Sequence, residues 1–239
     1  MTGNLKLLWL SPPVLFRGKG IIQAWGDEMS RHGWDIETDP AKIKDCDLVF
    51  FGSDSVLDEA LLDVRPSILY FWGWMPERLL DRTFQKWAAE KLKLMARVTR
   101  IVAPSPCVID QLACFGLPGM PCYPGVDGQA LAIKDPPQRR GQVMFLSRLA
   151  PHKGLDVLIQ AMSMLDPVPE LVACGPAEDP NLTKAYQGLA AEFKVPARFM
   201  ELTDEEKAQE LARSIALVHP SSYEGWGMPP LEALYLGTP

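Results

Sequence analysis

Two basic residues in the second half of the chain have the type and spacing of an anion site. Arg148 and Lys153 flank the turn 149–152, between an expected strand that ends near Ser147 and an expected helix that begins near Gly154. Cations beside a helix N-terminus attract an anion, because unpaired backbone N–H groups and the helix dipole add to the side-chain charge. The alternative is a pair of exposed basic residues on a surface turn.

Two acidic residues follow later, separated by seven positions. Glu224 lies in the loop after an expected strand at 215–219, and Glu232 lies early in the next expected helix. A carboxylate only accepts hydrogen bonds and has two oxygens, which suits a pair of neighbouring sugar hydroxyls. Gly225 and Gly227 allow the backbone between the acids to approach a ligand closely. Favourable acids at a helix N-terminus would explain Glu232 but not the two glycines.

The elements that must position these residues are predicted from hydrophobic periodicity. Short apolar runs predict strands at 5–10, 34–37, 47–51, 67–71, 100–103, 143–146, 170–174, 197–201 and 215–219. Amphipathic stretches predict helices at 21–31, 76–98, 107–114, 154–164, 182–193, from 203 onward and at 231–236. Strands that alternate with helices indicate an α/β fold, in which parallel sheets carry helices on both faces.

The chain is expected to form two domains joined by a hinge. The segment 118–138 is rich in Pro and Gly, and its end is interpreted as a linker. We therefore predict an N-terminal domain at 1–136 and a C-terminal domain at 137–239, with a ligand cleft between them. The sequence stops after the predicted helix at 231–236, where another strand is expected. The second domain is therefore expected to be incomplete, with its C-terminal segment truncated.

The motifs of the second half occur in the order found in one enzyme family. They comprise 147–149, 153–154, 174–176, 219–221, the two glutamates with their seven-residue spacing, and 237–239, preceded by 124–127. This set resembles the retaining glycosyltransferases of family four. The resemblance covers nearly all of the second half and is weaker in the first. It implies the GT-B fold, with two facing Rossmann-like domains and a nucleotide-sugar held mainly by the second.

The resemblance also implies roles for the four charged residues. Arg148 and Lys153 match the cations that bind the donor diphosphate and stabilise the departing nucleotide without a metal. Glu232 matches the carboxylate that accepts the ribose hydroxyls. Glu224 matches the carboxylate near the donor sugar, where negative charge favours an oxocarbenium-like transition state. Glu224, Arg148 and Lys153 are therefore the expected catalytic residues.

Two backbone segments complete the implied site. The donor is expected to meet the amides around Gly225, Trp226, Gly227 and Met228. The acceptor and phosphate loop of the family corresponds to Gly18, Lys19 and Gly20. One departure concerns the segment 72–75, where many relatives place a histidine and this chain has Trp-Gly-Trp-Met. That difference bears on activity or on the choice of acceptor.

The predicted function is transfer of a sugar from a UDP-, GDP- or ADP-sugar to an acceptor hydroxyl on a glycan, a lipid or a small molecule. No cofactor or metal is expected. The alternative is an inactive glycosyltransferase-like protein or fragment that binds nucleotide or glycan. Epimerases lack the spacing of Glu224 and Glu232, and phosphorylases need a pyridoxal lysine in a much larger chain. The literal Asp-x-Asp at 45–47 precedes an expected strand rather than following one, which argues against a metal motif.

Composition limits the surroundings of the protein. The 239 residues carry a net charge of −6, so binding of nucleic acid through bulk charge is not expected. The five cysteines form no paired motif, which favours a reducing cytoplasm. No run of about 18 apolar residues occurs. The basic stretch 77–100 could lie on the inner face of an anionic membrane that carries a lipid-linked acceptor, or could be a surface helix with its apolar stripe on the core.

Overall fold

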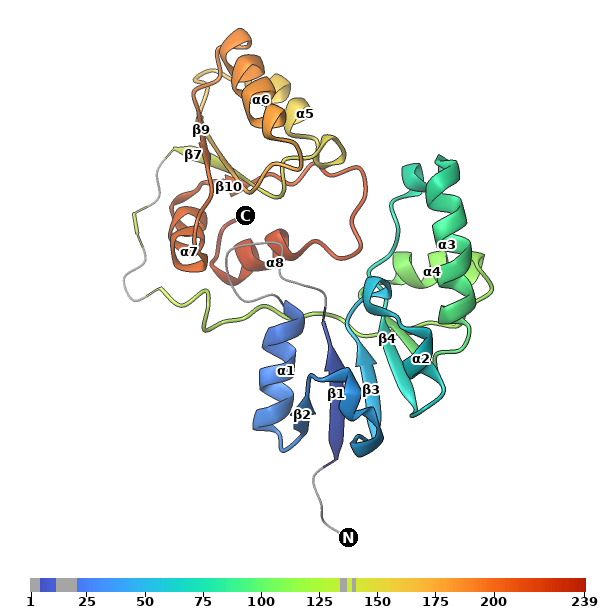
Figure 1. Ribbon diagram of the computed structural model, residues 1–239. Helices are drawn as coiled ribbons and strands as arrows, with labels where there is room; N and C mark the ends of the chain where they lie inside the picture. Colours follow the sequence, from blue (N-terminus) through green and yellow to red (C-terminus); the bar gives the residue numbers. More distant parts are fainter. Residues whose placement is uncertain (1–4, 12–20, 134–136, 139–140) are drawn as a thin grey trace. The chain divides into compact units, whose positions relative to one another are not determined.

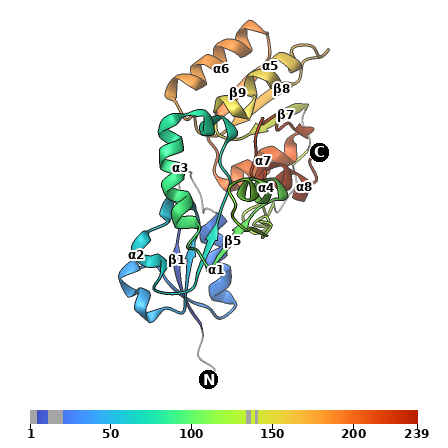
Figure 2. The same cartoon turned by 90° about the vertical axis from the view of Figure 1, so that its right-hand side faces the viewer.

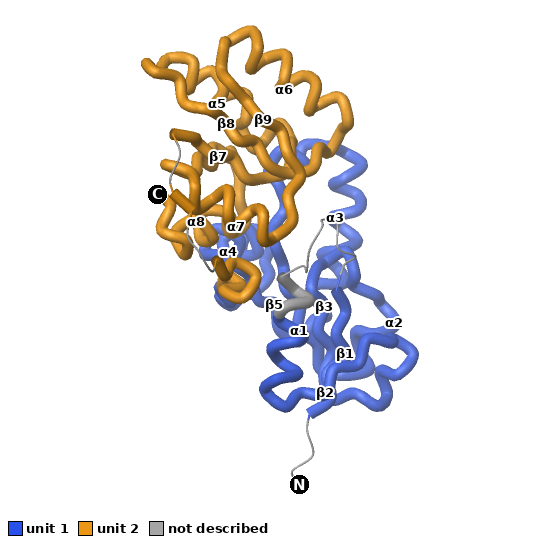
Figure 3. Tube along the Cα trace, turned by 90° about the vertical axis from the view of Figure 1, so that its left-hand side faces the viewer, with its two compact units in different colours: residues 1–15, 19–124 blue, residues 16–18, 125–239 orange. Residues whose placement is uncertain are grey.

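The computed structural model describes residues 5–11, 21–133, 137–138 and 141–239 of the chain. These residues form two compact units, which divide between Pro124 and Gly125 and are coloured separately in Figure 3. Each unit contains one sheet. The predicted domain boundary, between 136 and 137, lies later in the chain and stays a prediction. The predicted loop of Gly18, Lys19 and Gly20 lies outside the described residues.

The first unit contains a parallel sheet with six strands, in the order β2-β1-β3-β4-β5-β6 (Figure 1). Its strands are β1 (Lys6–Leu10), β2 (Asp35–Glu37), β3 (Leu48–Phe51), β4 (Ser67–Tyr70), β5 (Arg100–Ala103) and β6 (Met120–Pro121). Its α-helices are α1 (Ile21–Arg31), α2 (Glu59–Leu62), α3 (Arg82–Met95) and α4 (Pro106–Cys114). Three short 3-10 helices complete it, namely η1 (Pro40–Asp45), η2 (Asp54–Val56) and η3 (Pro76–Leu80).

Alternate residues of the first sheet bury opposite faces. Leu8 and Phe51 belong to a core that also contains buried side chains of α2, α3 and α4. Their neighbours Leu7 and Phe50 belong to a second core, against which Trp25 of α1 packs. Successive side chains of a strand point to opposite faces, so apolar runs of four or five residues produce a sheet that is covered on both sides.

The second unit contains a parallel sheet with four strands, in the order β10-β7-β8-β9. Its strands are β7 (Gln142–Leu146), β8 (Glu170–Cys174), β9 (Ala197–Met200) and β10 (Ala216–Leu217). Its helices are η4 (Pro151–Lys153), α5 (Leu155–Met162), α6 (Pro180–Glu192), α7 (Asp204–Arg213) and α8 (Met228–Tyr235). Both sheets have the all-parallel, Rossmann-like arrangement that the alternation of strands and helices predicts.

The two faces of the second sheet are again covered by different helices. Phe145 lies in a core with Ile159 of α5 and Tyr186 of α6. Its neighbour Met144 lies in a core with Leu211 of α7 and Ala233 of α8. Figure 2 shows α5 and α6 above this sheet and α7 and α8 below it. Every strand in the sheet runs in the same direction, so the loops that follow the strands gather at one edge, which is where open α/β sheets bind ligands.

One predicted helix differs from the structure. The stretch 76–98 was expected to be continuous, but η3 ends at Leu80, and α3 begins at Arg82. Between them, Asp81 has extended backbone, and its side chain accepts a hydrogen bond from the backbone N–H of Phe84. An aspartate whose side chain caps the following turn has extended backbone itself, so the helix begins after it and is not continuous through it. No helix of the described residues is long and apolar enough to cross a membrane.

Candidate functional site

The loops at the carboxyl edge of the second sheet are packed closely, and two glycines make this packing possible. A Cβ atom on Gly154 would lie 2.4 Å from the carbonyl oxygen of Pro220, in the loop after β10. A Cβ atom on Gly175 would lie 2.0 Å from the carbonyl oxygen of Ser147, in the loop after β7. Both glycines also have a positive φ, of +72° and +142° respectively, which L side chains rarely adopt. The close approach brings functional side chains from three loops to one edge.

Lys153 and Glu224 are in direct contact at this edge. The Lys153 Nζ atom donates to Glu224 Oε1 over 2.6 Å, and His219 Nε2 lies 2.7 Å from the same oxygen. The side chains of Lys153 and His219 are each only 10% exposed, and that of Glu224 is 28% exposed. Ser221 Oγ lies 3.3 Å from His219 Nε2 and completes the cluster. The loop after β7 and the loop after β10 are thus joined by a carboxylate with two partners.

This environment keeps Glu224 ionised. Burial raises the pKa of Glu224, but the hydrogen bonds of His219 and Lys153 and the charge of Lys153 outweigh it, so the pKa falls to about 2. The carboxylate therefore carries a full negative charge at neutral pH. A charged group with these partners can stabilise positive charge that develops on a bound molecule.

Arg148, at the start of the loop after β7, forms a second ion pair. Its guanidinium binds the carboxylate of Glu178, in the loop after β8, and both side chains are partly exposed. The four charged groups of the two ion pairs also influence the pKa of His152, which belongs to the loop after β7. Burial lowers the pKa of His152, Lys153 and Arg148 lower it further, and Glu178 and Glu224 raise it. The net pKa of His152 is lowered, so the imidazole is neutral more readily than a free one.

Glu232 belongs to a third ion pair, which links α8 to α7. Its Oε1 atom lies 3.0 Å from Lys207 Nζ, and the same ammonium lies 3.1 Å from Asp204 Oδ1. Burial lowers the pKa of Lys207, but the charges and hydrogen bonds of Glu232 and Asp204 outweigh it, and the net pKa is raised. Lys207 is therefore protonated at neutral pH and holds both carboxylates.

The segment 225–228 leads from the loop after β10 into α8. Gly227 has a φ of +84° and caps the helix, which begins at Met228 with prolines in its first turn, three residues before the predicted start at 231. A Cβ atom on Gly225 would meet no atom within 4 Å, so the backbone is accessible at that position. Trp226 and Met228 are both partly buried.

The structure thus brings two of the predicted site residues into contact with each other, and others are paired with residues that were not predicted. Lys153 and Glu224 contact each other directly, whereas Arg148 and Glu232 each contact a different partner. Three of those partners were not predicted, namely Glu178, His219 and Lys207. His219 could have been found, because it opens the motif 219–221, but Glu178 and Lys207 have no sequence signal of their own.

In the first unit, the described loops after β3 and β4 at the corresponding edge carry aromatic side chains. Trp72, which follows β4, donates from Nε1 to the carbonyl oxygen of Gly52 over 2.9 Å. Trp74 is buried and donates from Nε1 to Asp54 Oδ2 over 2.8 Å. The ring of Trp74 also contacts Phe71 edge-on, with centroids 5.3 Å apart. The segment 72–75, which departs from the family pattern, is therefore built into the fold of the first unit.

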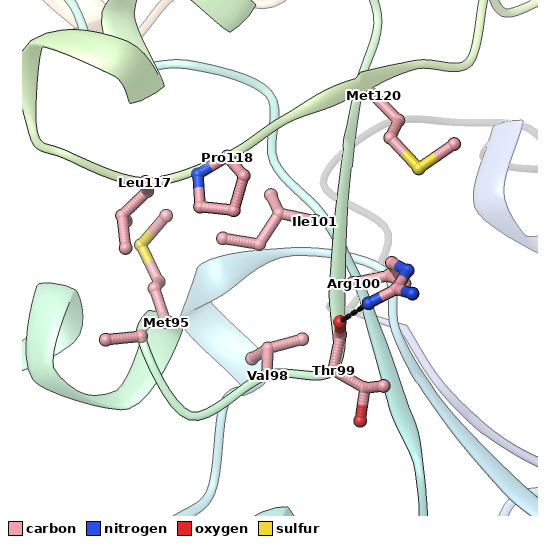
Figure 4. A pocket seen from close by; sticks show the side chains of 9 residues that line it. Met95, Val98, Thr99, Arg100, Ile101, Leu117, Pro118 and Met120 are labelled. Carbon is pink, nitrogen blue, oxygen red and sulfur yellow. Dashed lines mark hydrogen bonds between the residues drawn. The ribbon is translucent and has the colours of Figure 1, made fainter.

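A cavity of about 240 Å³ lies at the other end of the first sheet, where β5 begins (Figure 4). Met95, Ile101 and Leu117 line it, together with Arg100, whose guanidinium donates to the carbonyl oxygen of Thr99 over 2.8 Å. Its position at the amino end of a strand separates it from the carboxyl edge. Across the described residues, no group of three His, Cys, Asp or Glu side chains is arranged to hold a metal ion.

Comparison with known proteins connects the second unit with a family. Residues 130–239, somewhat less than half of the chain, match the family described as "Glycosyl transferases group 1". A curated D-inositol 3-phosphate glycosyltransferase from Corynebacterium efficiens is 35% identical over 106 residues. That match covers 41% of this chain and 25% of the relative, so the chain spans about a quarter of the relative's length. The second unit is therefore similar to the glycosyl transferases group 1.

Solved structures show the fold of the whole chain. Anabaena HepE, solved with UDP-glucose, has a TM-score of 0.77 at 17% identity, over 99% of this chain and 79% of that one. Sucrose-phosphate synthase from Thermosynechococcus elongatus has a TM-score of 0.74 at 15% identity, over 99% of this chain and 80% of that one. Both similarities confirm the predicted GT-B-like architecture of two Rossmann-like units with parallel sheets.

Proposed function

We propose that this protein is a glycosyltransferase that moves a sugar from a nucleotide-diphosphate sugar to an acceptor hydroxyl. The observation that carries the proposal is the contact of Lys153 and His219 with Glu224, which shares the carboxyl edge of the second sheet with the ion pair of Arg148. The match of residues 130–239 to the glycosyl transferases group 1 supports it. Anabaena HepE, which has a similar fold, was solved with UDP and with UDP-glucose, and this supports a nucleotide-sugar donor.

The cations supply the first part of the mechanism. Arg148 and Lys153 are each held by one carboxylate, and a diphosphate carries more negative charge than the carboxylate that it would replace. Fixed cations next to a departing nucleotide stabilise the charge that develops as the bond to the sugar breaks. Because side chains supply this charge, the proposed mechanism is metal-independent and requires no cofactor.

The carboxylates supply the second part. Glu224 keeps its negative charge because its pKa is about 2, and this charge favours an oxocarbenium-like transition state of the donor sugar. Glu232 accepts hydrogen bonds from the ribose, and the amides of Gly225 to Met228 meet the phosphate or the sugar. Retention of the anomeric configuration and membership of family four are further parts of the proposal. Both come from the resemblance of the motifs.

The first domain is proposed to bind the acceptor, which is a glycan, a lipid or a small molecule. The segment Gly18, Lys19 and Gly20 would bring the donor and the acceptor together. We also propose a cytoplasmic location, since the composition and the donor class both favour it.

A peripheral membrane contact through residues 77–100 is part of the same proposal. Leu80 is 82% exposed and Trp87 is 40% exposed, and Lys91 lies over the Trp87 ring at 5.8 Å. Exposed apolar side chains beside lysines are suited to an anionic surface. The protein should sediment with vesicles that contain phosphatidylglycerol, and Leu80→Ser should reduce this binding. Equal binding to neutral vesicles, or none to either kind, would contradict the membrane contact.

The proposed activity can be tested in two steps. Calorimetric titration with UDP, GDP and ADP identifies the base, and the corresponding sugar nucleotides are then assayed for nucleotide release with and without acceptors. We expect one nucleotide to bind more tightly than the others and its sugar form to be consumed. Tight binding without turnover would instead support the non-catalytic alternative. If none of the three nucleotides binds, the proposal is wrong.

A further inference from the structure

Lys207 has no role in the proposed mechanism, but it contacts a carboxylate that has one. Its Nζ atom lies 3.0 Å from Glu232 Oε1 and 3.1 Å from Asp204 Oδ1. Lys207 belongs to α7 and Glu232 to α8, and their side chains are 18% and 14% exposed. An ion pair that joins two helices and is this well covered fixes its members more firmly than a pair on the open surface.

Hydrogen bonds in the first turn of α7 hold the backbone of Lys207 in place. Thr203 caps this helix, and its Oγ1 atom accepts from the backbone N–H of Glu206 over 3.3 Å. The Glu206 side chain accepts in return from the backbone N–H of Thr203 over 2.9 Å, which completes a capping box. The backbone N–H of Lys207 donates to the carbonyl oxygen of Thr203 over 2.8 Å. The first turn is therefore held by several hydrogen bonds, and Asp204 then restrains the ammonium group itself.

The contact with Lys207 restrains the orientation of the Glu232 carboxylate. Within the described residues, Lys207 is the side chain that Glu232 contacts, and it does so through Oε1 alone. Oε2 thus keeps its lone pairs for another donor. A carboxylate on a flexible side chain has many orientations, and a fixed cation on one oxygen selects among them. The contact with Lys207 therefore restricts the directions in which Oε2 can point.

We propose that Lys207 is a positioning residue, which holds Oε1 of Glu232 so that Oε2 accepts a hydrogen bond from the 2′-hydroxyl of the donor ribose. This inference rests on the proposed function, which assigns Glu232 to the ribose. It adds a specificity determinant on α7, a helix that carries none of the predicted site residues. A purely structural link between α7 and α8 would affect stability but would not distinguish ribose from deoxyribose.

The test compares two nucleotides that differ by one hydroxyl. Affinities for UDP and 2′-deoxy-UDP are measured by calorimetry on the wild type, K207Q, K207R and K184Q. Lys184 is an exposed residue of α6 and serves as the matched control. If the donor screen favours GDP or ADP, the ribose and deoxyribose forms of that nucleotide replace the uridine pair.

The wild type should bind UDP at least about tenfold more tightly than 2′-deoxy-UDP, because a hydrogen bond to a charged group is lost. In K207Q, affinity for UDP should fall about tenfold while affinity for 2′-deoxy-UDP changes less than about twofold, so the preference disappears. K207R should keep most of the preference, because an arginine can still bind the carboxylate. K184Q should match the wild type.

Three results would overturn the inference while leaving nucleotide binding intact. The first is a K207Q variant, folded by circular dichroism, that keeps the preference for UDP. The second is an equal loss of affinity for both nucleotides, which indicates a structural link only. The third is a wild type that binds both nucleotides equally, which would show that Glu232 does not bind the ribose hydroxyl. Failure of the wild type to bind any ribonucleoside diphosphate is a different result, because it contradicts the proposed function itself.

Discussion

The two sheets of this protein end in loops with different chemistry. After β7, β8 and β10 of the second unit, the loops carry cations that are paired with carboxylates, and the central pair is Lys153 with Glu224. After β3 and β4 of the first unit, the loops carry tryptophans, of which Trp74 is buried against Asp54. The folds are alike, since both sheets are parallel and covered by helices. The sheet edge alone therefore does not determine what a unit can bind.

What differs is the partner of the carboxylate that each unit holds at this edge. Asp54 is 9% exposed and accepts a hydrogen bond from the neutral indole of Trp74. Glu224 is held by the ammonium of Lys153 and by His219. A neutral indole gains little when a phosphate replaces its carboxylate, whereas an ammonium group binds either anion strongly. We call the loops after β7, β8 and β10 the charged loops and those after β3 and β4 the aromatic loops. The comparison indicates that the cations of the charged loops can exchange a carboxylate for a ligand's phosphate. The aromatic loops are structural.

The largest expected effect is on turnover, in Glu224→Gln. The amide keeps the size of the side chain and loses the charge that the proposed mechanism uses. Turnover of the sugar nucleotide should fall about 10²- to 10³-fold, as for removal of an electrostatic stabiliser at a reacting centre. Affinity for the free nucleotide should change less than about threefold, because Lys153 remains available to the diphosphate. Steady-state kinetics and calorimetry measure the two effects.

The matched control for this variant is Glu192→Gln, since Glu192 lies exposed at the end of α6. It should have wild-type turnover and affinity. Wild-type turnover in Glu224→Gln would contradict the catalytic role of the charged loops and would remove the contrast between the two units.

The second prediction concerns acid sensitivity of the second unit. The pKa of Glu224 is about 2 in the folded protein and 4.5 without the fold. A carboxylate with a lowered pKa stabilises the fold above pH 4.5, and this contribution is lost as the pH falls toward 2. The contribution should be at most about 3 kcal/mol, and less because the group is partly exposed.

Urea unfolding at pH 6 and near pH 3, followed by circular dichroism, measures this contribution. The wild type should be more stable than Glu224→Gln at the higher pH, and the difference should shrink at the lower pH. Parallel losses of stability in the two proteins would show that His219 and Lys153 do not lower the pKa of Glu224 as described.

The fold could be predicted from the sequence to a large extent, because it depends on local patterns. Apolar runs of four or five residues predict the strands, and the capping box at Thr203 predicts the start of α7. The break at Asp81 was missed because an apolar periodicity that continues past it outweighed a single capping residue. The short helix α2 was also missed, since four residues are too few for a helical period to show.

The site could be predicted only in part, because its ion pairs join residues that are far apart in the sequence. Arg148 and Glu178 are 30 positions apart, and Lys207 and Glu232 are 25 positions apart. Sheet topology predicts that the loops after the strands share an edge, so the proximity of Lys153 and Glu224 could be predicted from the sequence. Which acid binds which cation depends on side-chain packing across loops, and no local pattern contains that information.

The third prediction tests the first unit. Asp54→Ala leaves the indole N–H of Trp74 buried without an acceptor, which should reduce the free energy of unfolding by about 2 kcal/mol. Asp54→Asn keeps an acceptor and should cost less. Nucleotide affinity should be unchanged in both, since the aromatic loops are structural. Urea unfolding and calorimetry are the measurements. A folded Asp54→Asn variant with tenfold weaker nucleotide binding would show that the contrast between the two units is wrong.

The smallest expected effect is in Glu178→Gln, which releases Arg148. The pair is partly exposed, so its own contribution to stability should be under about 1 kcal/mol. Its carboxylate nevertheless competes with a diphosphate for the same guanidinium. Removing this competitor should raise nucleotide affinity about two- to fivefold at low salt, and the gain should fade as salt screens exposed charges. Calorimetry at two salt concentrations measures it.

The control for this small effect is the same Glu178→Gln substitution made in an Arg148→Ala variant. Arg148→Ala alone should weaken nucleotide binding, and adding Glu178→Gln should then change nothing, because the competition acts only through the guanidinium. A gain that persists without Arg148 would reflect general loss of negative charge near the site. A loss of affinity in Glu178→Gln alone would mean that Glu178 orients Arg148 for the ligand. In that case the charged loops would be preorganised by their ion pairs, and exchange of partners would not explain how they differ from the aromatic loops.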